Sequence, residues 1–493
     1  MAPTETMLES AAYTRMRMEN PAEFVPRSVF FARDGGSGID RRNSLWVKAA
    51  LVYESITGRH VNDGAKPVAT SLLIRLANAC RSCIDGAQPP QAKTSTPVSE
   101  VLEKGVKGLA VISGASTNAA GGGVKEVVGG GGKTAELPAD EEGSDENKQM
   151  IDAIFLVVGF LPRLVKAAVG ISRDAVDEGF KSTHMQDIVT DVIKMENQLP
   201  LGHLLNVVDH VEAAVRQVAA ATAAGDELEG LQGFLNEYKL GFTSDTFSDD
   251  VVRPFCWYYS PFFSKQLPTA LPKASESIAG ADPETPARTL LDFLHASVVP
   301  MPRAATEKRK KGTTSGESES SGKTSRMPTA RELSRSGVRI GAGEDGRASV
   351  EFEEAAARLR LPALVYDFKL ATVARNLLAR EYEEQSKPVT RYFQMMNELV
   401  EEAADAKILR RAGAVRGGGT SGAEVHELVK RIDGYATYPS VFMAMDVQIE
   451  KVRQFHDKRM QNFLVRYRPG VIWASSVAAV SVVAIVAARR NRG

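Results

Sequence analysis

Residues 187–204 read DIVTDVIKMENQLPLGHL, an apolar helical stretch that runs into a proline. Pro200 disfavours helical backbone at Leu199, so Glu-Asn-Gln-Leu-Pro is expected to end a helix. A helix end leaves backbone carbonyl and amide groups without partners, and carboxylate and carboxamide side chains can bond to them. The sequence therefore predicts a structural motif at a helix break, formed by Glu196, Asn197, Gln198 and Pro200.

Catalysis is the alternative role for Glu196. A general acid or base needs a reacting partner within reach, and no partner base or nucleophile can be read around this residue. No G-x-S-x-G turn and no convincing Ser/His/Asp arrangement occurs elsewhere in the sequence. We therefore expect a protein that is not an enzyme, with no small-molecule substrate and no cofactor. The alternative left open is an uncharacterised enzyme whose site is assembled from residues far apart in the chain.

Composition changes divide the chain outward from this motif. Two long stretches, 40–85 and 148–224, carry the apolar spacing of helices. The segment between them is rich in Gly, Ser, Thr, Pro and Ala, which bury too little apolar surface to become ordered. The expected parts are an N-terminal helical part (1–85), a disordered Gly-rich insert (86–147), a helical core (148–302), a disordered basic and Ser-rich linker (303–327), a β-hairpin with helices (328–468) and a transmembrane helix (469–488).

Two short segments predict strands within this mostly helical chain. SGVRI (336–340) and ASVEFE (348–353) alternate apolar and polar residues and bracket the turn-forming sequence GAGEDGR. ARLRLPALVYD (357–367) follows with the same alternation. The expected fold class is therefore mainly α, a multi-helical body with a small antiparallel β-sheet and one C-terminal transmembrane helix.

The transmembrane prediction rests on GVIWASSVAAVSVVAIVAA, which has no charged residue from Gly470 to Ala488. At 1.5 Å per residue a helix of this length spans roughly 28 Å, about one hydrocarbon core. Trp473 stands where an aromatic belt would lie, and arginines flank both ends. We expect a single-pass membrane protein held in the lipid bilayer, with its bulk in the cytoplasm, at the plasma membrane or another organelle membrane.

Composition excludes several classes of protein. The 493 residues contain 61 Lys plus Arg and 61 Asp plus Glu, so the formal net charge is zero. A uniformly basic nucleic-acid binder is therefore excluded, and we expect no nucleic-acid partner. Three cysteines are too few for a secreted scaffold built on disulfides.

Two segments, GGGGKT (129–134) and SSGKTS (320–325), are similar to phosphate-binding loops. That loop needs a glycine five residues before its Gly-Lys pair, and Val127 and Glu317 stand there instead. Both segments are therefore interpreted as linker. The run KRKK (308–311) is interpreted as a solvated charge run, with a nuclear localisation signal or a lipid-headgroup patch as alternatives.

The metal-ligating residue types give little support for a metal site. Cys80 and Cys83 form a C-x-x-C pair, but a zinc site needs four ligands and no second pair is present. Their spacing places both on a helix. His203 and His210 are seven residues apart and can share a helix face, but no His pair has the spacing of a metal-binding helix.

Several segments taken together resemble the plant family that carries domain of unknown function 247. The most specific is the apolar helix that ends in Glu-Asn-Gln, an apolar residue and proline. The resemblance covers about residues 150–493 and is poor over 1–149. Further segments resemble the family in the same order: an Asp-bearing apolar helix (150–161), a Leu-Leu-Asp helix (289–300), a Pro-x-Ala-x-Glu-Leu segment (327–340) and a helix before glycine (391–415).

This resemblance implies a plant protein of interaction or signalling type with no assigned reaction. Some grass members of the family are implicated in pollen–stigma self-incompatibility, as recognition determinants. The expected function is therefore that of a membrane-anchored protein that binds a protein partner yet to be identified.

Overall fold

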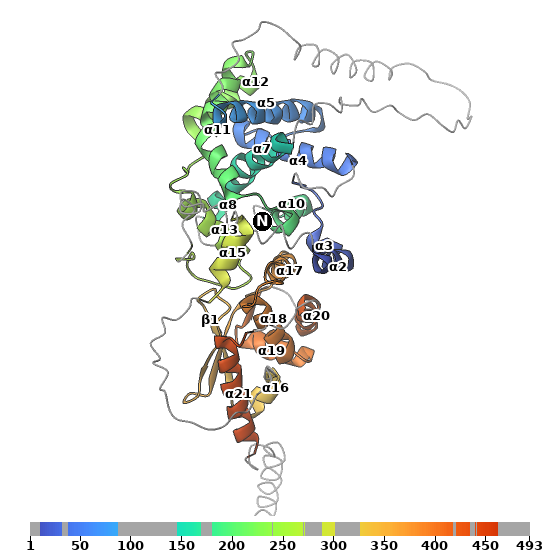
Figure 1. Ribbon diagram of the computed structural model, residues 1–493, viewed down its shortest axis with the longest axis vertical. Helices are drawn as coiled ribbons and strands as arrows, with labels where there is room; N and C mark the ends of the chain where they lie inside the picture. Colours follow the sequence, from blue (N-terminus) through green and yellow to red (C-terminus); the bar gives the residue numbers. More distant parts are fainter. Residues whose placement is uncertain are drawn as a thin grey trace, which may run out of the picture.

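Helices of the N-terminal half form one end of an elongated body, and helices and short strands of the C-terminal half form the other (Figure 1). This computed structural model describes residues 10–31, 38–86, 145–168, 180–238, 240–269, 271, 288–300, 326–417, 421–433, 439 and 441–461. Most of the expected Gly-rich insert (86–147) and nearly all of the expected linker (303–327) lie outside the described residues.

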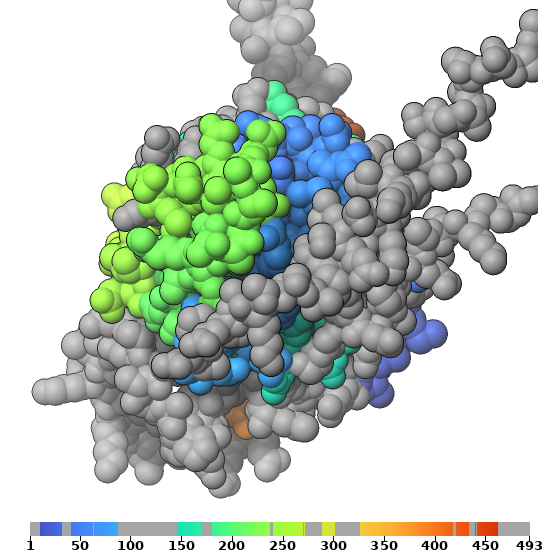
Figure 2. Space-filling model, turned by 90° about the horizontal axis from the view of Figure 1, so that it is seen from above, coloured from blue at the N-terminus to red at the C-terminus, as the bar shows by residue number. Residues whose placement is uncertain are grey.

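The N-terminal end combines long amphipathic helices with short helical segments. Its elements are α2 (Ala11–Glu19), α3 (Pro21–Phe24), α4 (Gly38–Thr57), η1 (Asp63–Ala65), α5 (Lys66–Ile84), α7 (Asp145–Ile154), η3 (Phe155–Phe160), α8 (Leu161–Ala168), α10 (Thr183–Ile193), η4 (Met195–Asn197), α11 (Leu201–Ala221), α12 (Asp226–Gly233), η5 (Phe234–Tyr238), η6 (Ser248–Val252) and α13 (Arg253–Tyr259). Helix α5 packs on α4 and α11, and α12 packs on α4. Figure 2 shows the segment with α4 and α5 (blue) beside the segment with α11 and α12 (green) on one face.

The C-terminal end combines shorter helices with two small sheets. Its elements are α15 (Leu290–Val298), α16 (Ala330–Arg335), β1 (Arg339–Gly343), β2 (Glu351–Glu353), β3 (Arg358–Pro362), β4 (Leu364–Val365), α17 (Leu370–Arg380), α18 (Pro388–Leu399), α19 (Ala403–Arg411), β5 (Val415–Arg416), α20 (Gly422–Asp433) and α21 (Ala444–Met460). Helix α17 contacts α3 and α10, so it joins the two ends of the body.

The larger sheet differs from the prediction. Strand β3 lies between β1 and β2, parallel to β1 and antiparallel to β2. The predicted hairpin between 336–340 and 348–353, and the purely antiparallel sheet, are therefore wrong. The tight turn instead joins β2 to β3 and ends at Ala357, whose φ is 47°. Glycine and asparagine usually mark such a left-handed position, and alanine gives no such signal in the sequence.

The transmembrane helix of the predicted fold class is also contradicted. Within the part of the chain that the structure describes, no helix is both long and apolar enough to cross a membrane. The long helices α5 and α11 bury one face and carry polar residues on the other, as helices around a protein core do. The transmembrane helix is therefore not supported as part of the fold. The segment 469–488, with Gly470, Trp473 and Ala488, lies outside the described residues.

Aromatic rings connect distant parts of the chain through the core. Phe31 contacts Phe155 edge-on at 6.1 Å between ring centroids, and Phe155 stacks on Phe160 at 6.4 Å. Phe180 continues the series with centroids 6.0 Å from Phe160 and 6.2 Å from Tyr258. The N-terminal segment, η3 and α13 therefore share one apolar core, which positions the polar groups described next.

Candidate functional site

The Glu-Asn-Gln motif lies beside a fully buried carboxylate, that of Asp191 near the end of α10. This carboxylate accepts the backbone N–H groups of Arg27, Ser28 and Val29 at 2.6–3.0 Å. It also accepts the ammonium of Lys194, which is equally buried, at 2.9 Å. Burial of a lone charge would be very unfavourable, and these four donors compensate it.

Asn197 binds the same N-terminal segment. Its side-chain oxygen accepts the Phe31 N–H at 3.0 Å. Its side-chain nitrogen donates to the carbonyls of Val29 at 2.6 Å and of Asp191 at 3.0 Å. Since Asn197 is only 3% exposed, water cannot replace these bonds. The carboxamide therefore joins the end of α10 to the segment Val29–Phe31 that follows α3.

Gln198 connects the helix break to α15. Its side-chain nitrogen donates to the carbonyls of Val192 and Lys194, both at 3.0 Å, which are groups left free where α10 ends. Its side-chain oxygen accepts the N–H of Leu291 in the first turn of α15 at 3.0 Å. Pro200 follows as the residue that precedes the first turn of α11.

Glu196 faces the N-terminal helix α2. Its carboxylate accepts the Arg17 guanidinium at 2.5 Å and the Tyr13 hydroxyl at 3.2 Å. Burial, and then the nearby Glu196 charge, raise the pKa of the Tyr13 phenol well above its ordinary value. A carboxylate held by an arginine and a neutral phenol is suited to an ion pair at the edge of the core.

A carboxamide from the other end of the body completes the arrangement. The side-chain oxygen of Asn376 accepts the Met195 N–H at 2.8 Å, and its nitrogen donates to the carbonyls of Glu23 and Thr372. We name Asp191, Lys194, Asn197, Gln198 and Asn376 the polar junction. It holds α3, α10, α15 and α17 together through bonds to their backbones.

The sequence interpretation identified two members of the polar junction and missed the others. Asp191 and Lys194 were not singled out, although a carboxylate and an ammonium three residues apart in an apolar helix are a signal of a buried ion pair. Asn376 lies in α17, where the sequence around it contains no such signal. Every polar atom of the Asn197 and Gln198 carboxamides bonds to the backbone, so the junction acts on the fold.

Two of the other family-like segments also carry charged side chains with partners. Asp152 of α7 forms an ion pair with Lys48 at 2.5 Å, and Lys48 also donates to the Phe30 carbonyl. Asp292 caps the first turn of α15 and binds Arg380 at 2.6 Å.

The cysteines and histidines singled out in the sequence lie on helices. Cys80 is buried in α5, and burial raises the pKa of its thiol to about 12. Cys83 lies one turn further and is half-buried. His203 and His210 both lie on α11, where the His210 ring contacts the Asn206 carbonyl at 2.8 Å. Among the described residues, no group of three or more His, Cys, Asp or Glu side chains could hold a metal ion.

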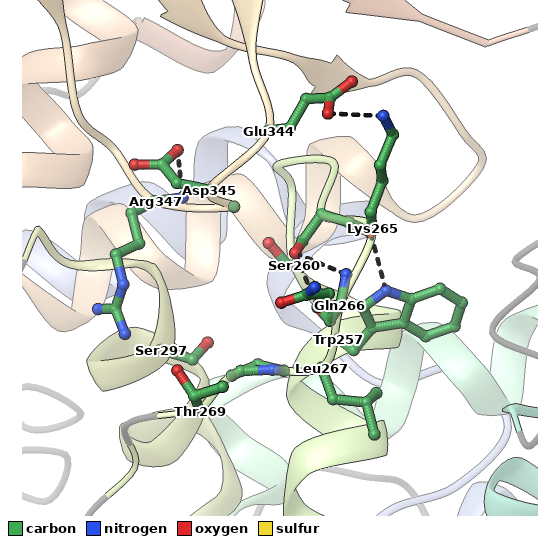
Figure 3. Close-up of a pocket in the computed structure, with 13 residues that line it drawn as sticks. Trp257, Ser260, Lys265, Gln266, Leu267, Thr269, Ser297, Glu344, Asp345 and Arg347 are labelled. Atoms are coloured by element: carbon green, nitrogen blue, oxygen red, sulfur yellow. Dashed lines mark hydrogen bonds and ion pairs between the residues drawn. The ribbon is translucent and has the colours of Figure 1, made fainter.

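A polar cavity of about 270 Å³ lies where the loop after α13 meets the loop between β1 and β2 (Figure 3). Lys265 forms an ion pair with Glu344 at 2.7 Å, and this bond holds the pKa of the Glu344 carboxyl below its ordinary value. Arg347 donates to the carbonyl of Val299 at 2.6 Å. Asp345 also takes part in a bond within the protein, from the Ser349 hydroxyl. The charged groups around the cavity are therefore compensated by one another or by the backbone.

Three other sequence interpretations lie outside the described residues. They concern GGGGKT (129–134), SSGKTS (320–325) and KRKK (308–311).

Comparison with known proteins confirms the resemblance seen in the sequence. Residues 143–488 match DUF247, a family described as plant protein of unknown function. A UPF0481 protein of Arabidopsis thaliana is 32% identical over 92 residues, which are 18% of this chain and 17% of that relative. No solved structure matches the chain.

Proposed function

Because this chain belongs to the plant protein family DUF247, we propose that it is a binding protein without catalytic chemistry, which recognises another protein through its surface. The observation that carries the proposal is the use of the family-like motif. Every polar atom of the Asn197 and Gln198 carboxamides forms a hydrogen bond with a backbone group. A motif bonded in this way has a structural role, which leaves the molecular surface as the place where a partner would be recognised.

One surface has the chemistry of a protein-binding face. Val441 and Phe442 precede α21 and are 45% and 63% exposed, and Val447 in the first turn of α21 is 40% exposed. Phe442 directly precedes the N-cap residue Met443, and Val447 is the fourth residue of α21. Apolar side chains at these two positions commonly pack against each other. We name these three residues the α21 patch. Exposed apolar groups gathered in this way favour contact with an apolar surface of a partner.

An enzyme is the second candidate, and the polar cavity of Figure 3 favours it. Lys265, Thr269 and Ser297 line that cavity together with the loop between β1 and β2. Polar groups from separate segments that converge in a cavity are the usual form of a small-molecule site. Its volume of about 270 Å³ is at the small end for such a site.

Proximity labelling in plant cells separates the two functions. The test protein is the full chain with Val441→Ser and Phe442→Ser, and the matched control is Met18→Ser, an equally apolar residue that is 77% exposed on α2. We expect the patch variant to lose a defined set of labelled proteins at unchanged abundance, and the control to keep that set.

The opposite result would reject the binding proposal. If the patch variant labels the same proteins as the unaltered chain, the α21 patch is not the binding face. If Thr269→Val in the cavity changes the small-molecule content of the cells while labelling is unaltered, the enzyme candidate replaces it.

A further inference from the structure

A second hollow, of about 550 Å³, lies at the C-terminal end of α19, where the chain turns into β5. Its charged lining is entirely basic and comes from Lys407, Arg410, Arg411 and Arg416. We propose that this basic hollow binds the phosphomonoester group of a ligand. The proposal does not depend on the α21 patch, which belongs to another element.

The basic residues of α19 are not needed to end the helix. Cations in a last helical turn often bond the free carbonyls there. In α19 the backbone itself does so: Gly413, with φ 73°, donates to the Arg410 carbonyl at 3.0 Å, and Ala414 donates to the Leu409 carbonyl at 2.9 Å. The helix dipole still favours cations at this end. The side-chain donors of Lys407 and Arg411 are therefore not used to cap the carbonyls at this end.

Two of the four cations have no partner in the described part of the chain. Lys407 and Arg411 are exposed, and neither makes an ion pair or a side-chain hydrogen bond there. The acidic residues of α19 lie at its other end, where Glu402 and Asp405 form the capping box. Positive charge therefore gathers at the hollow without an acidic group from the same helix to compensate it.

Arg416 is held in place on the opposite wall. Its guanidinium lies 3.9 Å from the centre of the Phe263 ring and 3.4 Å from a carboxylate oxygen of Glu344. Glu344 also binds Lys265, so its negative charge is shared between two cations. A guanidinium already fixed by stacking loses little freedom when it binds the oxygens of a phosphate.

Backbone hydrogen bonds and a close approach fix the geometry around the hollow. The N–H groups of Leu364 and Tyr366 donate to the carbonyls of Ala414 and Arg416, which fixes β5 on β4. Gly417 follows with φ 137°, and a side chain there would lie 2.3 Å from the Tyr366 carbonyl oxygen. This close approach sets the position of Arg416 relative to α19, so the site is formed before any ligand arrives.

The number and type of cations point to phosphate among the common anions. A carboxylate carries one charge and is satisfied by one guanidinium fork. A phosphomonoester carries nearly two charges at neutral pH and offers three oxygens, which matches several guanidinium groups and one ammonium. The group can belong to a soluble molecule or to a lipid headgroup, and both present the same chemistry to the hollow.

The test compares the full chain with a variant and a charge-matched control. The variant is Lys407→Ala with Arg411→Ala. The control is Lys451→Ala with Lys458→Ala, which removes two exposed cations from α21. Binding of glycerol 3-phosphate, a soluble phosphomonoester, is measured by titration calorimetry. Binding to phosphatidylcholine vesicles that contain phosphatidylinositol bisphosphate is measured by flotation, with phosphatidylserine vesicles of equal charge as reference.

We expect the variant to bind at least about tenfold more weakly than the unaltered chain, because two charge-assisted contacts are lost, and the control to bind as before. Binding of glycerol 3-phosphate identifies a soluble source, and binding of the phosphoinositide vesicles alone identifies a lipid source. The proposal is overturned if neither probe binds, if the variant binds as well as the unaltered chain, or if the control loses as much. Equal binding to phosphatidylserine vesicles overturns it as well.

Discussion

Replacement of Asn197 by alanine is expected to destabilise the fold strongly. The carboxamide accepts the Phe31 N–H at 3.0 Å and donates to the Val29 carbonyl at 2.6 Å. The Asp191 carbonyl keeps a second bond, from the Lys194 N–H at 3.2 Å. Alanine therefore leaves two buried backbone groups without a partner. Each such group costs ~1–3 kcal/mol, so the free energy of unfolding should fall by about 2–6 kcal/mol.

The assay is thermal unfolding of the full chain followed by circular dichroism. In a protein of this size 1 kcal/mol corresponds to about 2 °C, so the melting temperature should fall by roughly 4–12 °C. Asn206→Ala is the matched control, because Asn206 lies exposed on α11 and its loss should change stability by no more than ~0.5 kcal/mol.

A second substitution tests the geometry directly. Asn197→Asp keeps the oxygen that accepts the Phe31 N–H, but it places an oxygen against the Val29 carbonyl and buries a charge. It should therefore be at least as damaging as alanine. Equal melting temperatures for Asn197→Ala and Asn206→Ala would refute the reasoning. If partner labelling were lost at the same time, Asn197 would be a ligand-binding residue and not a structural one.

Three further predictions concern other contacts within the fold. Asp152→Asn should cost about 3–5 kcal/mol in urea unfolding because it leaves the buried Lys48 ammonium without an opposite charge. Asp152→Leu with Lys48→Met should recover much of that loss, and a double variant as unstable as the single one would contradict this. Burial raises the pKa of Cys80 from 9.0 to about 12, so the unfolded chain loses this proton first and stability should fall as pH rises above about 9. The melting temperature of Cys80→Ala should therefore fall less between about pH 9 and pH 10 than that of the unaltered chain, and equal falls would speak against this. Gly417→Ala should cost ~1–3 kcal/mol in thermal melts through its clash with the Tyr366 carbonyl, whereas Gly341→Ala, with open space at that position, should be nearly neutral; similar losses for both would argue against the clash.

The local part of the fold could be read from the sequence because it depends on neighbouring residues. Pro200 excludes helical backbone at Leu199, and η4 ends just before it at Asn197, although α10 itself ends earlier, at Ile193. The apolar spacing of 40–85 matches the two helices α4 and α5. The hairpin was misplaced because its turn uses Ala357 in a left-handed conformation, which costs energy that only the finished sheet compensates.

The polar junction could be predicted only in part. That Asn197 and Gln198 would bond backbone groups follows from a helix break, but which groups they bond depends on pairings across the whole chain. The N–H groups that Asp191 accepts belong to residues more than 160 positions earlier. The basic hollow could not be predicted from the sequence either, because the pairing of β4 with β5 brings Arg416 to the cations of α19 and no local pattern specifies that pairing.

The separation between the junction's partners has a consequence for the newly made protein. Arg27 leaves the ribosome 164 residues before Asp191, whose carboxylate receives its N–H. At about 5–20 residues per second, that interval lasts roughly 8–33 s. During this time the elements that later bury the N-terminal apolar side chains are not yet made; these side chains are Phe24, Val29 and Phe31. This apolar segment is therefore accessible to chaperones during that interval.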